Sequence, residues 1–362
     1  MKAIILVGGL GTRLRPLTWN TPKSLVPVLN RPFLEYVLRN LKQHGVDDIV
    51  LALSNLASPI QECFGDGHKL GIQIEYAIEE SALGTAGAIK NAAANLTSAP
   101  FFVLNGDIFS NLDYGAMLNF HLKCNSRATI ALTKVDNPQA YGLVETNNSL
   151  RVTRFIEKPK AEEITTNFIN AGTYILEPSV LDLIPPETAY STERQLFPSM
   201  LANDDSVYAF PSEDYWIDIG NPEKYRQLNF DLLSGNGDQS SLHNSEKIVI
   251  GRNCQIHPTA KLESPVLIGD NCVVNSNVII TGPTVIGERC RIEEAATISD
   301  SVIWQGVTIS SGCRVDSSIA AEGCVFLPNC EVRQAVLGDH VTILQNHNLT
   351  SGSIVEPGQT IG

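Results

Sequence analysis

The sequence predicts two folds in succession, an α/β domain built on a doubly wound, mostly parallel sheet and then a three-sided parallel β-helix. Over residues 1–230, short apolar runs alternate with stretches of helical periodicity. Beyond residue 247, aliphatic side chains recur at every sixth position. The segment 232–247, rich in Ser, Gly and Asn, breaks both patterns. At 362 residues the chain is long enough to bury two cores.

The first region reads as alternating strands and helices. Apolar runs predict strands at 3–7, 49–53, 74–77, 101–104 and 129–135, and helical spacing predicts helices at 32–44 and 85–94. This alternation is typical of a doubly wound sheet, in which ligands bind at the carboxyl ends of the strands. We therefore expect a ligand-binding domain over residues 1–232 and a linker over 233–247.

The second region is a repeat. The aliphatic residues in phase are Ile250, Ile256, Leu262, Ile268, Val274, Ile280, Ile286, Ile292 and Ile298. By chance such a run is rarer than about one in a thousand. Six-residue sides in eighteen-residue coils describe a three-sided β-helix over 248–362, which resembles the left-handed hexapeptide-repeat helix. The phase slips after Ile298 and again near Ile319, so we expect the later coils to be irregular.

Six of the eight cysteines belong to this repeat. They are Cys254, Cys272, Cys290, Cys313, Cys324 and Cys330, and each precedes an inward residue by two positions. The chain has no CxxC pair and no Cys/His spacing suited to zinc, and no export signal that would favour disulfides. We predict that these cysteines fill the corners of the coils as small apolar side chains.

Composition excludes several partners. A net charge of −13 argues against nucleic acid, which is bound by clustered Lys and Arg. No window reaches the ~18 apolar residues that a membrane span needs, and the first apolar run is too short for a secretory signal. We expect a cytoplasmic protein whose ligands are small molecules.

The first apolar run leads into the loop GGLGTRLRPLT, residues 8–18. It lacks the GxxxxGK pattern of a P-loop, and Leu14 stands where the dinucleotide fingerprint requires glycine. Five cations precede the first acidic residue, Glu35: Lys2, Arg13, Arg15, Lys23 and Arg31. A glycine-rich turn followed by Arg13 and Lys23 suits a triphosphate. The alternative is an ordinary strand-to-helix turn with solvated cations.

Two aspartates stand where packing gives no reason for them. Asp107 ends a buried strand in LNGD, and Asp218 has a comparable place in WIDIG. Mg²⁺ takes oxygen ligands and usually only one or two protein carboxylates, the rest being phosphate and water. Two aspartates from separate strands fit that demand. The alternative is that each caps a turn through its backbone.

These motifs closely resemble those of the sugar-nucleotide pyrophosphorylases, a nucleotidyltransferase family. The likeness begins with GGLGTRLRPLTWNTPKSLVPVLNRPFLEY and continues through EESALGTAGAI, FFVLNGDIF, YGLVE, FIEKP, INAGTYIL, STERQLFP and YWIDIGNPEKY. The hexapeptide tail also occurs in this family. Within it, the likeness is strongest to members that transfer a guanylyl group from GTP to mannose 1-phosphate.

The resemblance implies displacement at the α-phosphorus of a nucleoside triphosphate by a sugar 1-phosphate, with release of pyrophosphate. The nucleophile is already anionic, so no general base is needed, and alignment and charge neutralisation carry catalysis. It implies that Asp107 and Asp218 hold Mg²⁺, that Arg13 contacts the leaving pyrophosphate and that Lys23 contacts the reacting phosphates. Removing Lys23 or Asp107 is expected to cost roughly 3 to 5 kcal/mol of barrier.

For the nucleotide, the resemblance implies a site made of Leu6, Gly8, Gly9, Gly11, Thr12, Arg13, Glu79, Gly84 and Thr85. Relatives that use UTP or dTTP commonly carry glutamine at the position of Glu79. A carboxylate only accepts hydrogen bonds, which matches the two donors on the Watson–Crick edge of guanine. The neighbouring Glu80 is an alternative reader of the base, and a solvated surface pair is another.

For the sugar phosphate, the resemblance implies Gly142, Glu157, Lys158 and Asn170, with Glu193 in a supporting role. A hexose presents donors and acceptors all round, so polar groups of both kinds are needed. Glu157 and Lys158 could instead form an ordinary surface pair. No residue in the sequence distinguishes mannose from glucose.

Three alternative functions stay open. The first is thymidylyl, uridylyl or adenylyl transfer to glucose 1-phosphate. The second is acyl transfer by the repeat domain, which would need a catalytic histidine, whereas His257, His340 and His347 are scattered. The third is a regulatory subunit without activity, although such relatives tend to lose the glycine loop, the lysine or an aspartate. We expect the β-helix to assemble the chain into a homo-oligomer.

Overall fold

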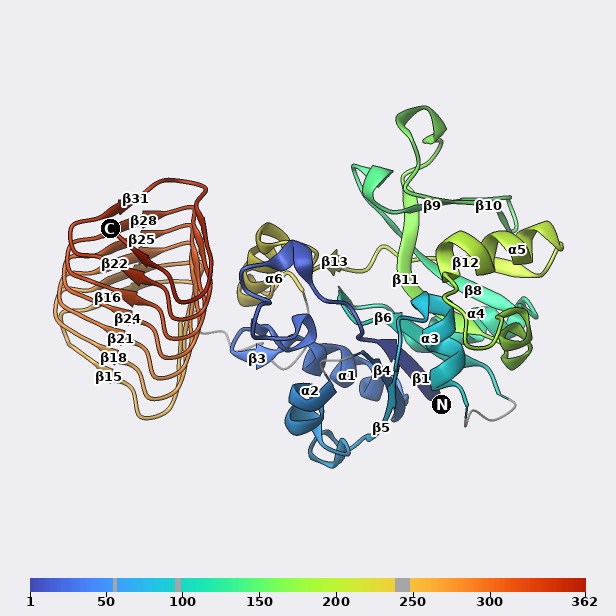
Figure 1. The fold of residues 1–362 in the computed structure, drawn as a ribbon, viewed down its shortest axis with the longest axis horizontal. Helices are drawn as coiled ribbons and strands as arrows, with labels where there is room; N and C mark the ends of the chain where they lie inside the picture. The colour runs from blue at the N-terminus through green and yellow to red at the C-terminus, as the bar shows by residue number, and fades with distance from the viewer. Residues whose placement is uncertain (55–56, 95–98, 238–247) are drawn as a thin grey trace. The chain divides into compact units, whose positions relative to one another are not determined.

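The computed structural model describes residues 1–54, 57–94, 99–237 and 248–362 (Figure 1). The chain forms two compact units. The first consists of Met1–Gly9 and Leu34–Trp216, and the second of Leu10–Phe33 and Ile217–Gly362. Most of the predicted linker, residues 238–247, lies outside the described residues, and the predicted domain boundaries stay a prediction.

The first unit contains a nine-stranded mixed sheet. Its parallel half has the order β6-β1-β4-β5, formed by β1 (Lys2–Leu6), β4 (Asp48–Leu53), β5 (Gln73–Ile78) and β6 (Phe101–Asn105). All four strands were predicted. The other half consists of β8 (Ala128–Lys134), β9 (Gly142–Thr146), β10 (Val152–Glu157), β11 (Phe168–Leu176) and β12 (Val207–Pro211). There β11 runs antiparallel to β6, β8 and β9, so the sheet is less uniformly parallel than the sequence pattern indicates.

Helices cover both faces of this sheet. They are α1 (Phe33–Gln43), α2 (Ala57–Phe64), α3 (Gly84–Ala92), α4 (Tyr114–Lys123) and α5 (Phe197–Ala202). Along β6, Phe101 and Val103 pack in one cluster with Ile89 of α3. Phe102, between them, faces the opposite side and meets Tyr114 of α4 edge to face, with ring centroids 5.3 Å apart. This alternation is the doubly wound arrangement that the sequence predicts.

Several short elements complete the two units. They are the 3₁₀ turns η1 (Thr12–Leu14), η2 (Lys23–Leu25), η3 (His68–Leu70), η4 (Pro138–Ala140), η5 (Ala161–Glu163) and η6 (Pro178–Leu183), the π-helical turn η7 (Thr192–Leu196), and the strands β2 (Pro27–Val28), β3 (Arg31–Pro32), β7 (Ile108–Ser110) and β13 (Trp216–Asp218). The helix α6 (Pro222–Ser234) belongs to the second unit. Asn221 caps its N-terminus by accepting a hydrogen bond from the Lys224 N–H at 2.9 Å.

The rest of the second unit is a parallel β-helix with three sheets, whose strands follow one another as a ladder in Figure 1. The first sheet contains β14 (Ile248–Ile250), β17 (Val266–Ile268), β20 (Thr284–Ile286), β23 (Val302–Ile303), β26 (Ile319–Ala320), β29 (Val336–Leu337) and β32 (Ile354–Val355). The second contains β15 (Gln255–Ile256), β18 (Val273–Val274), β21 (Arg291–Ile292), β24 (Thr308–Ile309), β27 (Val325–Phe326), β30 (Thr342–Ile343) and β33 (Thr360–Ile361). The third contains β16 (Lys261–Glu263), β19 (Ile279–Thr281), β22 (Thr297–Ser299), β25 (Arg314–Asp316), β28 (Glu331–Arg333) and β31 (Asn348–Leu349).

The predicted change of phase is a shortening of the coils by one residue. Val266 pairs with Thr284, eighteen positions on, whereas Val285 pairs with Val302, only seventeen positions on. The shortening falls at the corner before β23, where Asp300 adopts a left-handed conformation with φ of 45°. Parallel pairing continues through every later coil, and the irregularity is confined to coil length, which returns to eighteen residues between Val336 and Ile354.

The inward residues of the β-helix form one core. The aliphatic residues of the repeat from Ile268 onward pack in a single cluster with Cys272, Cys290, Cys313, Cys324 and Cys330. Cys254, Ile256 and Leu262 pack against this cluster, whereas Ile250 in the first coil is 47% exposed. The eight cysteines are free thiols. Burial raises the pKa of the Cys324 thiol to about 12, which keeps it protonated and apolar at neutral pH. The predicted structural role of the six repeat cysteines is confirmed.

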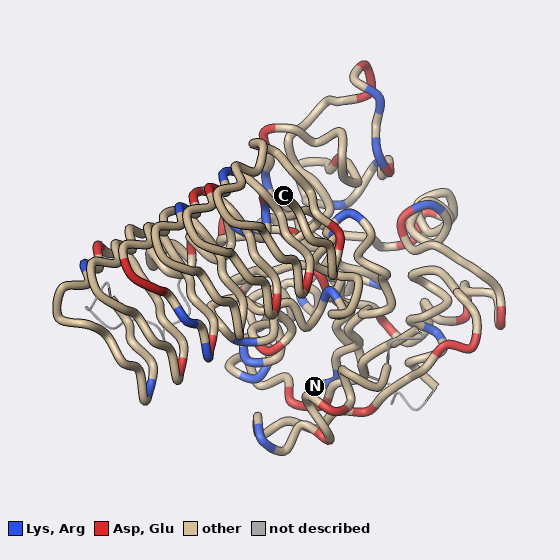
Figure 2. The backbone as a smooth tube through the Cα atoms, turned by 60° about the vertical axis from the view of Figure 1, so that its left-hand side comes forward, with Lys and Arg blue, Asp and Glu red and all other residues tan. Residues whose placement is uncertain are grey.

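On the outside of the coils, charges of both signs are interspersed (Figure 2). The guanidinium of Arg252 pairs with Asp270 of the next coil at 2.7 Å. Across the described ranges, no helix combines the length and the apolar character needed to cross a bilayer.

Candidate functional site

The predicted sugar residues lie on the antiparallel half of the sheet in the first unit. Gly142 of β9 pairs directly with Glu157 of β10. A β-carbon built on Gly142 would lie 3.0 Å from Glu157 Oε2 and 2.9 Å from the ring of Phe155. The carboxylate of Glu157 therefore occupies the space that any larger residue at Gly142 would fill. This explains why a glycine and an acidic residue occur together here.

Asn170 lies one strand away, at a bulge in β11. The register of β11 against β8 shifts between Asn170 and Tyr174, and Gly172 within the shift has φ of 68°. The amide of Asn170 accepts a hydrogen bond from the Gly172 N–H at 2.9 Å and donates one to the Tyr174 hydroxyl at 2.7 Å. Asn170 thus holds the bulge and Tyr174 in place, and one N–H of its amide stays available to a ligand.

Glu193 joins these residues to the predicted nucleotide site. The Tyr174 hydroxyl donates to Glu193 Oε1 at 3.5 Å, and the Thr85 hydroxyl donates to Glu193 Oε2 at 2.8 Å. Glu193 belongs to the π-helical turn η7, a rare element that is often found at functional sites. The structure therefore gives Glu193 a more central place than the supporting role expected from sequence, and it adds Tyr174, which sequence reasoning missed.

The pKa of Glu157 depends on the groups around it. Desolvation by burial raises the pKa of Glu157, and the negative charge of Glu193 raises it further. The positive charges of Lys158 and Arg194 act in the opposite direction. Lys158 is exposed and has φ of 56°, an unusual conformation for a residue other than glycine and one that clusters at functional sites. A carboxylate that accepts hydrogen bonds and an exposed cation beside it suit a phosphorylated sugar.

Gly84 and Thr85 begin α3, and both are held against one segment. Gly84 has φ of 68°, and a β-carbon there would lie 2.8 Å from the carbonyl oxygen of Tyr190. The Thr85 hydroxyl accepts a hydrogen bond from the Thr192 N–H at 2.8 Å. The Tyr190 carbonyl also accepts hydrogen bonds from the Ala86 and Gly87 N–H groups at 2.9 and 3.2 Å, so these contacts fix the first turn of α3.

Glu79 and Glu80 differ in burial. Glu79 is half-buried and its Oε2 accepts a hydrogen bond from the Leu83 N–H at 3.2 Å, whereas Glu80 is exposed. The contact orients the carboxylate of Glu79 and leaves Oε1 to accept other bonds. Glu79 is thus better placed than Glu80 for a fixed contact with a base.

Asp107 follows β6 at the carboxyl edge of the parallel strands, where Leu6 ends β1. The intervening Gly106 allows close approach, because its N–H donates to the Leu6 carbonyl at 2.9 Å and a β-carbon there would lie 2.6 Å from that oxygen. Two residues after Leu6, the carbonyl of Gly8 accepts a hydrogen bond from the Ser54 hydroxyl at 2.8 Å. Leu6, Gly8, Gly9 and Asp107 thus belong to one edge of the first unit.

The remaining phosphate residues belong to the second unit. Gly11 has φ of 61°, and a β-carbon there would lie 3.1 Å from Lys23 Cβ. The Thr18 hydroxyl donates to the Gly11 carbonyl at 2.8 Å. Lys23 therefore packs against the glycine turn, and the exposed Thr12 and Arg13 follow that turn directly.

Arg13 and Asp218 lie on either side of Gly220. A β-carbon on Gly220 would lie 2.7 Å from Asp218 Oδ2 and 3.5 Å from both terminal nitrogens of Arg13. Asp218 is 8% exposed and forms an ion pair with Lys224 in the first turn of α6. Within the second unit, Arg13 and Asp218 thus both lie near Gly220, and Lys23 lies near Gly11. Asp107 belongs to the first unit, and the predicted site shared by Asp107 and Asp218 stays a prediction.

Lys224 is a candidate residue that sequence reasoning missed. A cation in the first turn of a helix opposes the helix dipole, which is a signal that an anionic partner is nearby. Asp218 is that partner.

Magnesium is compatible with this donor set. Among the described residues, no group of three or more His, Cys, Asp or Glu side chains is arranged to hold a metal. A site with one or two aspartates is what Mg²⁺ uses when phosphate oxygens and water complete its shell. Asp107 of the first unit is half-buried and Asp218 of the second unit is buried, and each carboxylate is an oxygen donor of this kind. That both hold one ion stays a prediction.

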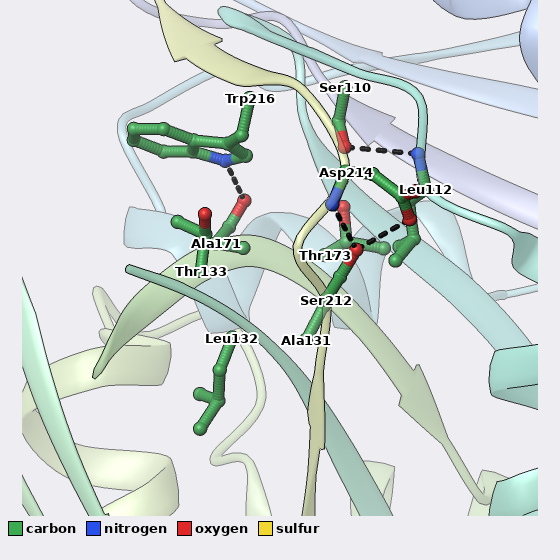
Figure 3. A pocket seen from close by; sticks show the side chains of 10 residues that line it. All are labelled: Ser110, Leu112, Ala131, Leu132, Thr133, Ala171, Thr173, Ser212, Asp214 and Trp216. Carbon is green, nitrogen blue, oxygen red and sulfur yellow. Dashed lines mark hydrogen bonds between the residues drawn. The ribbon is translucent and has the colours of Figure 1, made fainter. Parts of the chain in front are cut away.

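A small pocket in the first unit lies elsewhere on the sheet (Figure 3). Ala131, Thr133, Ala171 and Thr173 line it, and the indole of Trp216 closes one side by donating to the Ala171 carbonyl at 3.0 Å. Ala171 and Thr173 alternate with Asn170 and Tyr174 along β11. None of the predicted site residues lines this pocket, so we do not assign it to the substrates.

An α/β sheet with the predicted site residues at its strand ends, followed by a left-handed β-helix, is the architecture of a class of proteins that combine these two folds and act on nucleotides. Residues 2–235 match the family model described as nucleotidyl transferase, and the chain belongs to this family. Residues 245–349 match the model described as the EIF2B subunit epsilon LbH domain. The resemblance and the fold class predicted from the sequence are confirmed.

Curated relatives carry consistent names. The mannose-1-phosphate guanylyltransferase of Mycobacterium tuberculosis is 37% identical over 74% of this chain and 79% of its own length. The mannose-1-phosphate guanyltransferase of Yarrowia lipolytica is 40% identical over 72% of this chain and 73% of its own length. The probable mannose-1-phosphate guanylyltransferase 1 of Oryza sativa subsp. japonica is 35% identical over 95% of this chain and 100% of its own length.

Solved structures agree on the first fold. HddC from Yersinia pseudotuberculosis is 32% identical, with a TM-score of 0.57, over 64% of this chain and 99% of that chain. The same protein complexed with GMP-PN gives a TM-score of 0.56 at the same identity and coverage.

Proposed function

We propose that this nucleotidyltransferase is a mannose-1-phosphate guanylyltransferase, which makes GDP-mannose and pyrophosphate from GTP and mannose 1-phosphate. The observation that carries the proposal is the rice relative of that name, which aligns along 95% of this chain and along its own entire length. The complex of HddC with GMP-PN adds a guanine nucleotide in a protein of the same fold.

The proposed chemistry needs alignment and charge neutralisation. An oxygen of the sugar phosphate forms a bond to the α-phosphorus of GTP, and the bond between the α-phosphorus and the bridging oxygen breaks to release pyrophosphate. When bound by Asp107 and Asp218, Mg²⁺ would supply positive charge to the phosphates. We assign Arg13 to the leaving pyrophosphate and Lys23 to the reacting phosphates.

The remaining residues hold the two substrates. The backbone of Leu6, Gly8, Gly9, Gly11 and Thr12 is assigned to the nucleotide, together with Gly84 and Thr85 at the start of α3. Gly142, Glu157, Lys158 and Asn170 are assigned to the sugar phosphate. Hydrogen bonds support the pairing of these two sets of residues: Thr85 bonds to Glu193 at 2.8 Å, and Tyr174 bonds to the same carboxylate at 3.5 Å.

The test is pyrophosphate release over a matrix of substrates. GTP, dTTP, UTP, ATP and CTP are each paired with mannose, glucose and glucosamine 1-phosphates, with and without Mg²⁺. We expect the highest kcat/KM with GTP and mannose 1-phosphate, and no turnover after metal removal. Preference for another nucleotide would replace the guanylyl assignment, and absence of turnover with every pair would favour the regulatory-subunit alternative.

Base choice is tested at Glu79. In Glu79→Gln, the amide can donate to a carbonyl oxygen, so discrimination between GTP and UTP is expected to fall by the ~1 to 3 kcal/mol that a bidentate contact provides. The matched control is Glu80→Gln, which changes the exposed neighbour in the same way. Equal effects of the two variants on the ratio of kcat/KM values would argue against Glu79 as the reader of the base.

A further inference from the structure

One outer face of the β-helix is apolar. In the sheet that contains β20 and β23, the residues that point away from the core are Leu267, Val285, Val302, Ile319, Val336 and Ile354, none of which belongs to the interior cluster. Outward positions of the other two sheets include exposed charged residues such as Arg291 and Arg314. An isolated β-helix would leave this apolar stripe in water.

The middle of the stripe is buried in the folded chain. Val285, Val302 and Ile319 are at most 2% exposed, whereas Ile354 at the last coil is 63% exposed. Hydrogen bonds to this side of the β-helix come from α6 and from residues 10–33, which we call the phosphate loop. Arg226 of α6 donates to the Ser317 carbonyl at 2.7 Å, and Asn30 of the loop donates to the Ile286 carbonyl at 2.8 Å.

An aromatic pair relays one of these contacts to the phosphate loop. Trp304 lies outside the interior cluster and yet is 4% exposed, because Tyr225 of α6 packs against it with ring centroids 6.4 Å apart. The Trp304 indole donates to the Tyr225 hydroxyl at 2.9 Å, and that hydroxyl donates to the carbonyl of Pro27. The buried Trp304 indole and the buried Tyr225 hydroxyl thus both have hydrogen-bond partners, in a chain of two hydrogen bonds that ends on the phosphate loop.

A buried carboxylate provides a direct contact. Asp339 is 4% exposed, and its Oδ2 accepts a hydrogen bond from the Asn20 amide at 2.9 Å. Its Oδ1 accepts one from the Glu322 N–H of the preceding coil at 3.2 Å. A buried carboxylate is costly unless such bonds compensate it, so the loop contact at Asn20 is part of what makes this position tolerable.

The contacted segment is the one that carries the cations. Lys23 begins η2 only three residues after Asn20, and Pro27 follows it in β2. At the other end, the Thr18 hydroxyl bonds to Gly11, and Gly11 packs against Lys23. A shift of the segment 19–27 on the β-helix would therefore move Lys23 and the turn that precedes Arg13 together.

We propose that the β-helix is the platform that positions the phosphate loop, with Asp339, through Asn20, and Trp304, through Tyr225 and Pro27, as positioning residues for Lys23 and Arg13. The proposal rests on the proposed function, in which these two cations contact the phosphates. Misplacement by about 1 Å can cost on the order of 10²-fold in rate, so even a partial release of the loop is measurable in kcat.

The test compares Asp339→Ala and Asn20→Ala with Asp270→Ala in the full-length protein. Asp270 occupies the equivalent corner of an earlier coil and likewise accepts a hydrogen bond from a backbone N–H, that of Arg252, at 2.7 Å. Its side chain bonds to Arg252 and not to the phosphate loop. Hydrogen exchange of amides 16–30 is measured without substrates, and kcat and KM for GTP are measured separately.

In Asp339→Ala and Asn20→Ala we expect faster exchange over 16–30 and a fall of about tenfold or more in kcat, with Asp270→Ala within about twofold of the unaltered protein. The double variant is expected to be no worse than Asp339→Ala alone, because both substitutions remove the same contact between Asn20 and Asp339. Unchanged exchange over 16–30 in Asp339→Ala would overturn the proposal, and so would faster exchange with unaltered kcat and KM. The exchange comparison needs no turnover, so a failure of the proposed guanylyl transfer would be recognised separately in the substrate matrix.

Discussion

At the scale of single residues, the site combines groups whose ionisation depends on their neighbours. Burial and the negative charge of Glu193 disfavour the ionised form of Glu157, and the positive charges of Lys158 and Arg194 partly offset this. Asp218 is paired with Lys224, although a helix N-terminus disfavours a cation. Like-charge and opposite-charge pairs of this kind are characteristic of sites that bind charged ligands.

The raised pKa of Glu157 predicts a specific pH dependence. Because the pKa lies above the ordinary value of 4.5, the carboxylate takes up a proton at a higher pH than a free glutamate does. As the pH falls, we therefore expect KM for the sugar phosphate to rise, since a protonated carboxyl accepts hydrogen bonds less well. Glu157→Gln should abolish this acid limb, whereas Glu193→Gln should move it to lower pH by removing the neighbouring charge. A limb that both variants leave in place would have another origin.

The raised pKa of Glu157 affects stability in the opposite direction to that of a typical carboxyl group, whose pKa is lowered by folding. A carboxyl whose pKa is raised by folding binds its proton more tightly in the folded state, so it stabilises the protein as the pH falls through that window and destabilises it above. Glu157→Gln is therefore expected to raise the melting temperature slightly at neutral pH, measured against unaltered protein in the same buffer.

Lys23 gives the sharpest test of catalysis by charge. We expect Lys23→Met to lower kcat/KM by about 10² to 10⁴, which corresponds to roughly 3 to 5 kcal/mol. The matched control is Lys69→Met on the exposed turn η3 of the first unit, which removes the same charge without touching the predicted site. A loss below tenfold for Lys23→Met would exclude the assigned role.

At the scale of elements, periodicity predicted the strands and coils whose formation depends on residues close together in the sequence. The strands β1, β4, β5 and β6 follow from apolar runs, and the coils follow from a six-residue repeat. The antiparallel strands β9 to β11 were not predicted, because they carry the motif residues Gly142, Glu157 and Asn170, and polar motif residues interrupt the apolar pattern. The motifs identified these residues, yet only the fold shows that Gly142 pairs with Glu157.

The turn at the start of α3 tests how strictly one element depends on a glycine. Gly84→Ala places a β-carbon 2.8 Å from the Tyr190 carbonyl in a left-handed conformation, which costs roughly 1 to 2 kcal/mol for the backbone alone. We expect a lower melting temperature and weaker nucleotide binding, because Thr85 follows directly. Gly115→Ala is the control: this glycine lies within α4 without a positive φ, where alanine is generally favoured. Similar melting temperatures for the two variants would contradict the argument.

At the scale of the whole molecule, sequence distance limited what could be predicted. The contacts of Asn20 with Asp339 and of Tyr225 with Trp304 join positions 319 and 79 residues apart, and no periodicity connects them. The apolar stripe was present in the sequence as outward aliphatic residues beside each inward one. Its meaning depends on the phosphate loop belonging to the same compact unit as the β-helix.

The prediction that the chain assembles into a homo-oligomer is argued from the first coil of the β-helix. Within the described residues, β14 pairs only with β17, so its other edge presents free backbone groups, and Val249 and Ile250 there are 37% and 47% exposed. Open strand edges with apolar side chains are usually covered by another chain. We expect light scattering to give a homo-oligomer at micromolar concentration, and Ile250→Asp to lower the mass because it places a charge on that edge. The contacts described above between the β-helix and the phosphate loop lie on later coils than Ile250. We therefore expect the variant to keep a kcat close to that of the unaltered protein while its mass in solution falls. A monomeric unaltered protein would show that this edge stays open in solution.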